Sequence, residues 1–230
     1  MTNKNTSKRY KKLLEVSKDK KIENINDAIT KVKKNCTSKF DESIDVSLLL
    51  NLKSKKEETN LRTVVNLPNG NGKKIKIAVL CEENKVKEAK EAGADLSGSE
   101  NLINDISNGK INFDKLVATP TMMSKISKLG KILGPKGLMP NPKLGTVTND
   151  IKSSVKALKT GQIEIKNDEN GNIGASIGKK SFADSKIKEN YDVLIQSILK
   201  EKPNGVKGDF ILSAFLTSTM GVSYRLKIKG

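Results

Sequence analysis

The chain has 230 residues, with 43 lysines and arginines against 26 acidic residues, and a formal net charge of +17. It contains no histidine, which excludes Ser-His-Asp and Cys-His catalysis, and its two cysteines, Cys36 and Cys81, are too few for a zinc site or a disulfide framework. No apolar run approaches the roughly 18 residues that span a bilayer, and no signal peptide is visible at the N-terminus.

The first 67 residues predict two helices followed by two strands. A Lys-rich helical pattern covers 4–20, and Asn26 is expected to cap a second helix with apolar residues at helical spacing. Strict alternation over 44–52 then predicts a half-buried strand. A charged loop over 53–60 separates it from a second expected strand over 61–67.

Residues 68–72 are a dense cluster of Pro, Asn and Gly, after which strands and helices alternate. The strands are nearly continuous apolar runs, of the kind that are buried on both faces. We expect strands over 75–81 and 115–118 and helices over 82–92, 99–106 and 121–132. This alternation indicates a small α/β unit with parallel strands.

A Gly- and Pro-rich stretch over 133–146 leads to another expected helix, which ends at Gly161. The pattern then returns to strict alternation, and 163–177 predicts a hairpin. The last expected elements are a helix over 184–200 and strands near 210–217 and 222–228.

The two ends of the chain thus share one pattern, and the middle has another. We predict one domain built from 1–67 plus 160–230 and a second domain inserted at 68–159. Within the insert, residues 121–159 carry eight basic groups and a single acidic residue, Asp150. One edge of the inserted domain is therefore expected to be strongly positive.

The positive charge indicates a polyanionic partner, with nucleic acid ahead of an anionic membrane surface. Only three of the basic residues are arginines, and lysine suits phosphate neutralisation better than base reading. Aromatic residues are 3% of the chain, too few for base stacking to be the main mode of binding. The composition favours a protein that binds folded nucleic acid.

Several short motifs are open to more than one interpretation. Gly134-Pro135-Lys136-Gly137 matches the GxxG loop of KH domains, but a rigid connector with solvated lysines fits the surrounding pattern better. Gly178-Lys179 resembles the end of a P-loop, yet it lies on a hairpin strand and lacks the upstream glycine. Phe40, at a helix-to-strand junction, is either a core residue or an exposed platform, and the pattern alone favours the core.

Two other classes of protein remain as alternatives. A nucleotide-dependent enzyme acting on RNA would need a phosphate-binding loop after the strand over 75–81, where Glu82-Glu83 stands instead. A membrane-surface protein would need an aromatic-rich amphipathic helix, which the sequence lacks. For neither alternative does the sequence supply the residues that its binding site would need.

Six strings of residues carry a resemblance to a known family. The most specific is LGKILGPKGLMPNPKLGTVT at 129–148. The others are KFDES at 39–43, AGAD at 92–95, VATP at 117–120, IGKKSF at 177–182 and STMG at 218–221. Taken in their order along the chain, across nearly its whole length, the six strings resemble the bacterial large-subunit ribosomal protein L-one family, the ribosomal stalk protein at the tRNA exit site.

The resemblance implies an α/β fold of two domains, an outer discontinuous two-layer α/β domain and an inserted Rossmann-like three-layer α/β domain. It implies a structural protein that is not an enzyme, has no cofactor, is monomeric when free and is ribosome-associated in the cytoplasm. The implied partners are the large-subunit ribosomal RNA stalk, the protein's own mRNA leader, whose translation it represses, and exit-site tRNA, whose release it assists.

The resemblance also implies a set of rRNA contacts, and it reverses the interpretation of Phe40 in favour of exposure. The implied contacts are Lys39, Phe40, Glu42, Ser43, Gly178, Lys179, Ser213, Thr219, Met220 and Gly221. Candidate RNA contacts in the inserted domain are Lys131, Lys136 and Lys143. The sequence departs from the family pattern at Val222, at Gly174-Ala175-Ser176 and within 53–60.

Overall fold

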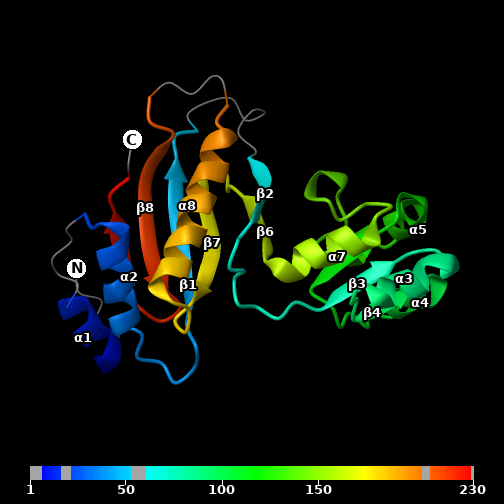
Figure 1. The fold of residues 1–230 in the computed structure, drawn as a ribbon, viewed down its shortest axis with the longest axis horizontal. Coiled ribbons are helices and arrows are strands. Elements are labelled where there is room, and N and C mark those ends of the chain that lie inside the picture. Colours follow the sequence, from blue (N-terminus) through cyan, green and yellow to red (C-terminus); the bar gives the residue numbers. More distant parts are fainter. Residues whose placement is uncertain (1–6, 17–21, 53–60, 204–207, 229–230) are drawn as a thin grey trace. The chain divides into compact units, whose positions relative to one another are not determined.

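The computed structural model describes residues 7–16, 22–52, 61–203 and 208–228. The chain divides into two compact units, of which unit 1 comprises Met1–Gly72 and Ile163–Gly230, and unit 2 comprises Lys73–Gln162 (Figure 1). Helices and sheets occur in both units, so the predicted α/β fold class is confirmed. Parts of the expected helix over 4–20 and all of the expected loop over 53–60 lie outside the described residues.

Unit 1 is built on a four-stranded antiparallel sheet in the order β7-β1-β8-β9. The strands are β1 (Ser43–Leu50), β7 (Asn172–Lys179), β8 (Ile211–Ser218) and β9 (Tyr224–Leu226). The alternation in β1 places Ile44, Val46 and Leu48 on one face, where all three are buried. Because β1 pairs with both β7 and β8, it is a central strand and its two neighbours are fixed by it.

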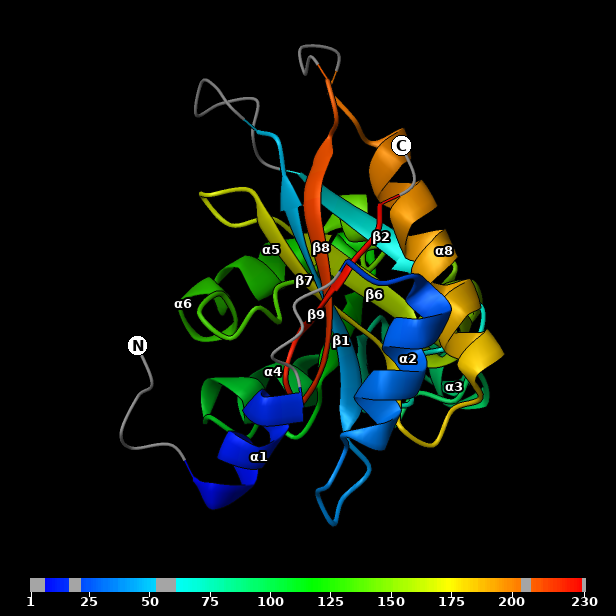
Figure 2. The ribbon, with the colours of Figure 1, turned by 90° about the vertical axis from the view of Figure 1, so that its left-hand side faces the viewer.

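Two helices, α2 (Ile25–Lys34) and α8 (Asp184–Lys200), pack on the apolar face of this sheet. Figure 2 shows both helices on the same side of β1 and β8. On the opposite face, Asp45, Ser47 and Leu49 of β1 are half-buried or exposed. Unit 1 therefore has two layers, and one face of its sheet is partly open to solvent.

The other described elements of unit 1 are α1 (Lys8–Val16), β2 (Arg62–Asn66) and β6 (Gln162–Lys166), and the last two pair as a separate two-stranded sheet. Leu13 anchors α1 in the core. The expected cap at Asn26 is wrong: α2 already begins at Ile25, and the carbonyl of Asn24 accepts the first helical hydrogen bond, from Ala28 at 3.0 Å.

The segment that leads out of unit 1 is held by a buried amide on α8. Asn190 is 0% exposed, and its Oδ1 accepts the N–H of Asn69 at 3.1 Å. Its Nδ2 donates to the carbonyls of Gly70 at 2.8 Å and Ile177 at 2.7 Å. The Pro-Asn-Gly cluster at 68–72 is thus tied to the core by hydrogen bonds that satisfy a buried polar group.

Unit 2 is built on a three-stranded parallel sheet in the order β4-β3-β5. The strands are β3 (Ile77–Leu80), β4 (Leu96–Gly98) and β5 (Lys115–Ala118). All four residues of β3 are buried, because one face contacts a cluster that contains Ile106 and Leu133 and the other a cluster that contains Val155. This is the three-layer, Rossmann-like arrangement that the resemblance implies.

The helices of unit 2 are α3 (Val86–Glu91), α4 (Glu100–Ser107), α5 (Met123–Ser127), α6 (Gly130–Leu133) and α7 (Ile151–Thr160). The single helix expected over 121–132 is wrong, because the chain forms two short helices, α5 and α6, which Lys128 and Leu129 separate. Strand β4 was not expected, since only one of its three residues is a large apolar residue, and it forms by pairing with β3.

Candidate nucleic-acid interface

Three loops of unit 1 meet at the end of the sheet where β1 begins. The first loop, 36–43, leads into β1, the second, 178–182, leads out of β7, and the third, 218–221, follows β8. They meet because β1 is antiparallel to both β7 and β8, so that its start adjoins the ends of its two neighbours. We call these residues the three-loop surface.

Backbone hydrogen bonds continue the strand pairing into the loops. Ser43 pairs with Lys179 across β1 and β7. The N–H of Thr219 donates to the carbonyl of Ser43 at 3.1 Å, and the N–H of Lys180 donates to the carbonyl of Glu42 at 2.8 Å. The loops are therefore extensions of the sheet, with backbone positions set by the strands.

Glu42 lies beneath this surface, with a side chain that is 0% exposed. Its Oε1 accepts the N–H of Ser38 at 3.0 Å, and its Oε2 accepts the hydroxyl of Ser218 at 2.7 Å and the N–H of Met220 at 3.2 Å. One carboxylate thus joins the first loop to the third. Its burial excludes direct contact of this side chain with RNA, so its role is to position the loops.

The charge state of Glu42 follows from these bonds. Burial by itself raises the pKa of the carboxyl group, but the hydrogen bonds from Ser218, Ser38 and Met220 outweigh burial and lower the pKa overall. The group is therefore ionised at neutral pH, and its hydrogen bonds are of the stronger, charge-assisted kind.

The second loop is tied to the first by three further hydrogen bonds. Asp41 accepts the N–H of Ser181 at 3.1 Å and its hydroxyl at 2.8 Å. The ammonium of Lys180 donates to the carbonyl of Cys36 at 2.8 Å. Cys36 is itself buried, and burial raises the pKa of its thiol, so it is a core residue and not a nucleophile.

Two large apolar side chains project from the three-loop surface. Phe40 is 53% exposed and Met220 is 47% exposed. The pattern-based expectation that Phe40 is a core residue is therefore wrong, and its exposure agrees with the family resemblance.

The other expected contacts on this surface differ in exposure. The side chains of Lys39 and Thr219 are exposed, and those of Ser43 and Lys179 are half-buried. Gly178 is buried. Gly221 is required where it stands, because a Cβ there would lie 2.4 Å from the Oγ of Ser218, the hydroxyl that bonds Glu42.

Ser213 lies apart from the three-loop surface. It is opposite Leu49 on β1, six residues from Ser43, or about 20 Å along a strand. Its side chain is half-buried and lies on the face of the sheet that α2 and α8 leave open. The open face therefore connects Ser213 with the three-loop surface.

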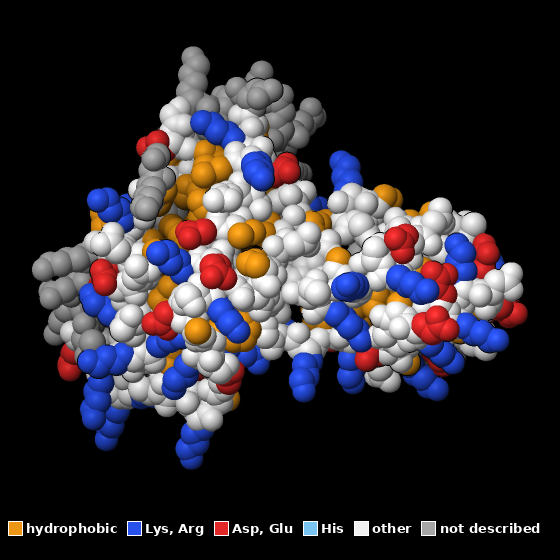
Figure 3. All heavy atoms as spheres, in the orientation of Figure 1, with side chains coloured by type: hydrophobic (Ala, Val, Ile, Leu, Met, Phe, Trp, Pro, Cys, Tyr) orange, Lys and Arg blue, Asp and Glu red, His pale blue; other side chains and the backbone are white. Residues whose placement is uncertain are grey.

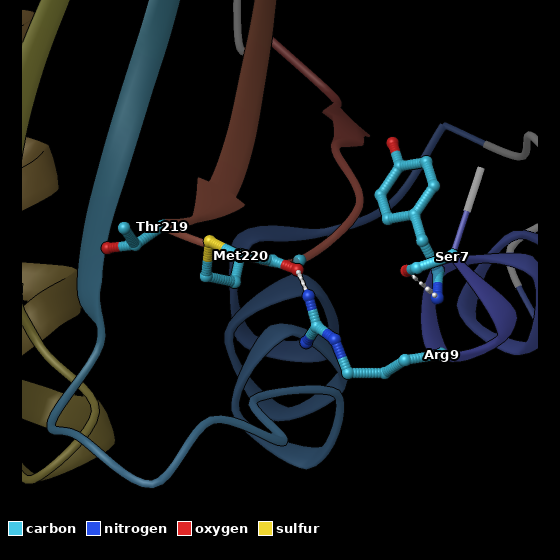
Figure 4. A pocket seen from close by; sticks show the side chains of 6 residues that line it. Ser7, Arg9, Thr219 and Met220 are labelled. Carbon is cyan, nitrogen blue, oxygen red and sulfur yellow. Dashed lines mark hydrogen bonds between the residues drawn. The ribbon is translucent and has the colours of Figure 1, made fainter. Parts of the chain in front are cut away.

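Sequence patterns missed two residues that organise this site, Arg9 and Ser38, and they gave Ser218 only as part of the string STMG, without its bond to Glu42. Arg9 reaches from α1 to the backbone of Met220 (Figure 4). These contacts join segments up to 211 residues apart, so no local pattern reveals them. One signal was available for Arg9, which is one of only three arginines among 43 basic residues.

In unit 2, Lys131, Lys136 and Lys143 are all exposed, within or beside the Gly- and Pro-rich stretch over 133–146. Asn141 orders this stretch, because its Oδ1 accepts the N–H of Lys143 at 2.9 Å and its own N–H donates to the hydroxyl of Thr146 at 2.8 Å. The exposed Glu82 and Glu83 follow β3, where a nucleotide-binding enzyme would bind phosphate.

The described residues offer few other sites. None of their His, Cys, Asp and Glu side chains form a group of three or more that could hold a metal ion. In the same part of the chain, no helix combines the length and apolar character that crossing a membrane requires. Figure 3 shows basic side chains spread over both units on the face drawn, with acidic side chains between them.

Comparison with known proteins decides the family. A sequence model of the Ribosomal protein L1p/L10e family matches residues 32–222. The chain is 57% identical over 223 residues to the large ribosomal subunit protein uL1 of Pelagibacter ubique (strain HTCC1062), which covers 96% of this chain and 97% of that protein. The chain belongs to the ribosomal protein L1p/L10e family.

Two further relatives support this family assignment. Proteins of the same name from Rickettsia prowazekii (strain Madrid E) and Rickettsia akari (strain Hartford) are 44% and 43% identical, over 96% of this chain and 93% and 92% of their own lengths. The resemblance to the L-one family is thereby confirmed. The L1p/L10e family consists of ribosomal proteins and not of enzymes, so the alternative of a nucleotide-dependent enzyme is wrong.

Two of the departures from the family pattern fall on described residues. Val222 is 5% exposed and packs in the core, so it can affect the surface only through the position of the third loop. Gly174 is exposed and Ser176 is half-buried on β7. The departure within 53–60 lies outside the described residues.

Proposed function

We propose that the chain is a structural constituent of the large ribosomal subunit and that unit 1 binds the folded rRNA of the ribosomal stalk. The contact surface is the three-loop surface together with the open sheet face as far as Ser213. One observation carries the proposal: the buried carboxylate of Glu42 fixes the two loops from which Phe40 and Met220 project. A preformed surface of this kind loses little conformational entropy on binding, which favours specific recognition.

Each group on the surface has a chemistry that suits folded RNA. Phe40 offers a ring on which an unstacked base or a ribose can pack. Met220 supplies an adaptable apolar contact, and Lys39 and Lys179 neutralise phosphates. The hydroxyl of Thr219 accepts the N–H of Ser43 at 3.0 Å, so its contribution is to close the third loop onto β1.

Two finer roles follow from the family resemblance. The same surface binds a similar fold in the protein's own mRNA leader and so represses its translation. In unit 2, the exposed Lys131, Lys136 and Lys143 contact exit-site tRNA and assist release of deacylated tRNA. The protein acts as a ribosome-associated cytoplasmic protein, free of any cofactor and monomeric before assembly.

The substitution Met220→Asp tests the surface. Because Met220 is 47% exposed, we expect the free energy of unfolding to stay within about 0.5 kcal/mol of wild type. The new carboxylate faces phosphate and removes an apolar anchor, so affinity for a labelled stalk RNA fragment should fall at least about 100-fold. Fluorescence anisotropy measures the affinity, and Met220→Leu, which keeps an apolar side chain, is the matched control.

Unchanged affinity of M220D would remove the third loop from the interface. Equal losses in M220D and M220L would show that the loop is sensitive to any change rather than to charge. For the mRNA role, unlabelled leader RNA must displace the stalk RNA from the wild-type protein, whereas simultaneous binding of both RNAs would contradict a shared surface.

A further inference from the structure

Arg9 of α1 spans from the N-terminal helix to two of the three loops. Its Nη1 donates to the hydroxyl of Thr37 at 2.8 Å, and its Nη2 donates to the carbonyl of Met220 at 3.0 Å. Figure 4 shows the side chain extended from the helix toward the turn, with its tip at the Met220 backbone. One guanidinium therefore links the loop that carries Phe40 to the loop that carries Met220.

The backbone of Met220 is thus held on both sides. Its N–H donates to the buried carboxylate of Glu42 at 3.2 Å, and its carbonyl accepts from Arg9. The peptide groups on either side of the Met220 Cα are fixed by two charged groups from different segments, an anion below and a cation beside the turn. Hydrogen bonds to charged groups are stronger than those between neutral groups.

Open space surrounds this link. A pocket of about 320 Å³ lies between α1 and the third loop, lined by Ser7, Arg9, Tyr10, Thr219, Met220 and Gly221. Both hydrogen bonds of Arg9 lie in an exposed setting rather than in the core. Removing the guanidinium should therefore release the turn without leaving a cavity in the core.

The chemistry of the link requires arginine. A guanidinium is planar and presents several N–H groups in a fixed fork, so it can bridge two oxygen acceptors at once. A lysine ammonium carries the same charge on a flexible stem and does not reproduce this geometry. In a chain whose other basic residues are nearly all lysines, arginine occupies the position on α1 whose side chain bonds to both loops.

We propose that Arg9 is a positioning residue for RNA recognition, which makes α1 a working part of the binding surface. It acts through Met220, by holding the turn in the orientation that presents the Met220 side chain. This inference rests on the proposed RNA-binding function, but the link between Arg9 and Met220 can itself be observed in the free protein.

The test compares Arg9→Lys and Arg9→Met with wild type, and Lys12→Met is the matched control. Lys12 is an exposed residue of the same helix, so its loss removes one charge without touching the turn. We expect R9K and R9M to bind the stalk RNA fragment about tenfold more weakly than wild type, because both lose the bridge. Both variants should also shift the Met220 methyl signal of the free protein in a ¹³C-methionine spectrum, and K12M should not.

Salt dependence separates positioning from direct phosphate contact. A lost phosphate contact lowers the slope of log affinity against log salt by about 0.7 to 0.9, whereas a lost positioning contact leaves the slope unchanged. We expect R9M to keep the wild-type slope. Wild-type affinity of R9K, or a reduced slope of R9M with an unmoved Met220 signal, would overturn the proposal.

Failure of the underlying function has a different signature. If the wild-type protein shows no preference for the stalk RNA, the proposed function fails, and recognition by way of Arg9 fails with it. If R9M still shifts the Met220 signal in that case, the link between Arg9 and Met220 exists but serves a function other than recognition of the stalk RNA.

Discussion

Replacing Glu42 by glutamine exchanges one carboxylate oxygen for an amide nitrogen beneath the three-loop surface. The wild-type carboxylate accepts three hydrogen bonds, two from the backbone N–H groups of Ser38 and Met220 and one from the hydroxyl of Ser218. The hydroxyl can rotate to face an amide nitrogen, but a backbone N–H cannot. Whichever way the amide turns, one backbone N–H loses its acceptor.

The magnitude follows from this count. A buried N–H without a partner costs about 1–3 kcal/mol, and the remaining bonds lose charge assistance worth about 1 kcal/mol more. We therefore expect E42Q to lower the free energy of unfolding by about 2–4 kcal/mol. For a chain of this size, each kcal/mol lowers the melting temperature by about 2–4 °C.

Tyrosine fluorescence during urea denaturation reports on the unit that contains Glu42. The chain has no tryptophan, and its three tyrosines, Tyr10, Tyr191 and Tyr224, all belong to unit 1. Glu169→Gln, an exposed position on the turn between β6 and β7, is the matched control and should change stability by less than about 0.5 kcal/mol. Equal stability of E42Q and wild type would refute the claim that the carboxylate of Glu42 holds the first and third loops together.

The pH dependence of the same variant gives an independent check. The pKa of Glu42 is lowered in the folded protein below its ordinary value of 4.5. Its ionised form therefore contributes stability that is fully present above about pH 4.5 and is lost as pH falls through the lowered folded-state pKa. Glutamine does not titrate, so the stability difference between wild type and E42Q should shrink as the pH falls below 4.5. A constant difference down to pH 2.5 would contradict the assignment.

Two further substitutions test other parts of the account. Phe40→Ala should leave the free energy of unfolding within about 0.5 kcal/mol of wild type. It should weaken binding of the stalk RNA by about 1–3 kcal/mol in an anisotropy titration. A loss of stability with unchanged binding would make Phe40 a core residue. Asn190→Ala should destabilise unit 1 by about 2–4 kcal/mol in urea, because it removes the partners of the half-buried backbone groups of Asn69 and Gly70 and of the buried carbonyl of Ile177. Gln196→Ala, at an exposed position of the same helix, should not.

Sequence patterns were most accurate for helices and strands that the local arrangement of apolar residues defines. Helix α8 spans 184–200, as the amphipathic pattern indicates, and β5 spans 115–118, as the apolar run indicates. Strand β4 escaped prediction because its stability comes from parallel pairing with β3, which a window of three residues cannot reveal. The break between α5 and α6 at Lys128 and Leu129 was likewise hidden by apolar residues that keep helical spacing across it.

The candidate site was predictable only in part. The family resemblance supplied Phe40 and Met220, and their exposure fits that assignment. It did not distinguish residues that can touch a partner from residues that act beneath the surface, and Glu42 belongs to the second group. Arg9 was missed because its partners, Thr37 and Met220, lie 28 and 211 residues away, a relation that only the folded chain creates.

The central claim is that a preformed surface of unit 1 recognises one folded RNA, beyond the attraction of a chain with a net charge of +17 for any polyanion. The most direct test measures binding of the wild-type protein to the isolated ribosomal RNA stalk fragment and to a shuffled RNA of equal length, across a salt series. If the surface is preformed and specific, both affinities fall as salt rises, while the preference for the stalk fragment persists at physiological salt. Equal affinities that vanish together would contradict this claim, and would leave the charge as the only basis for binding.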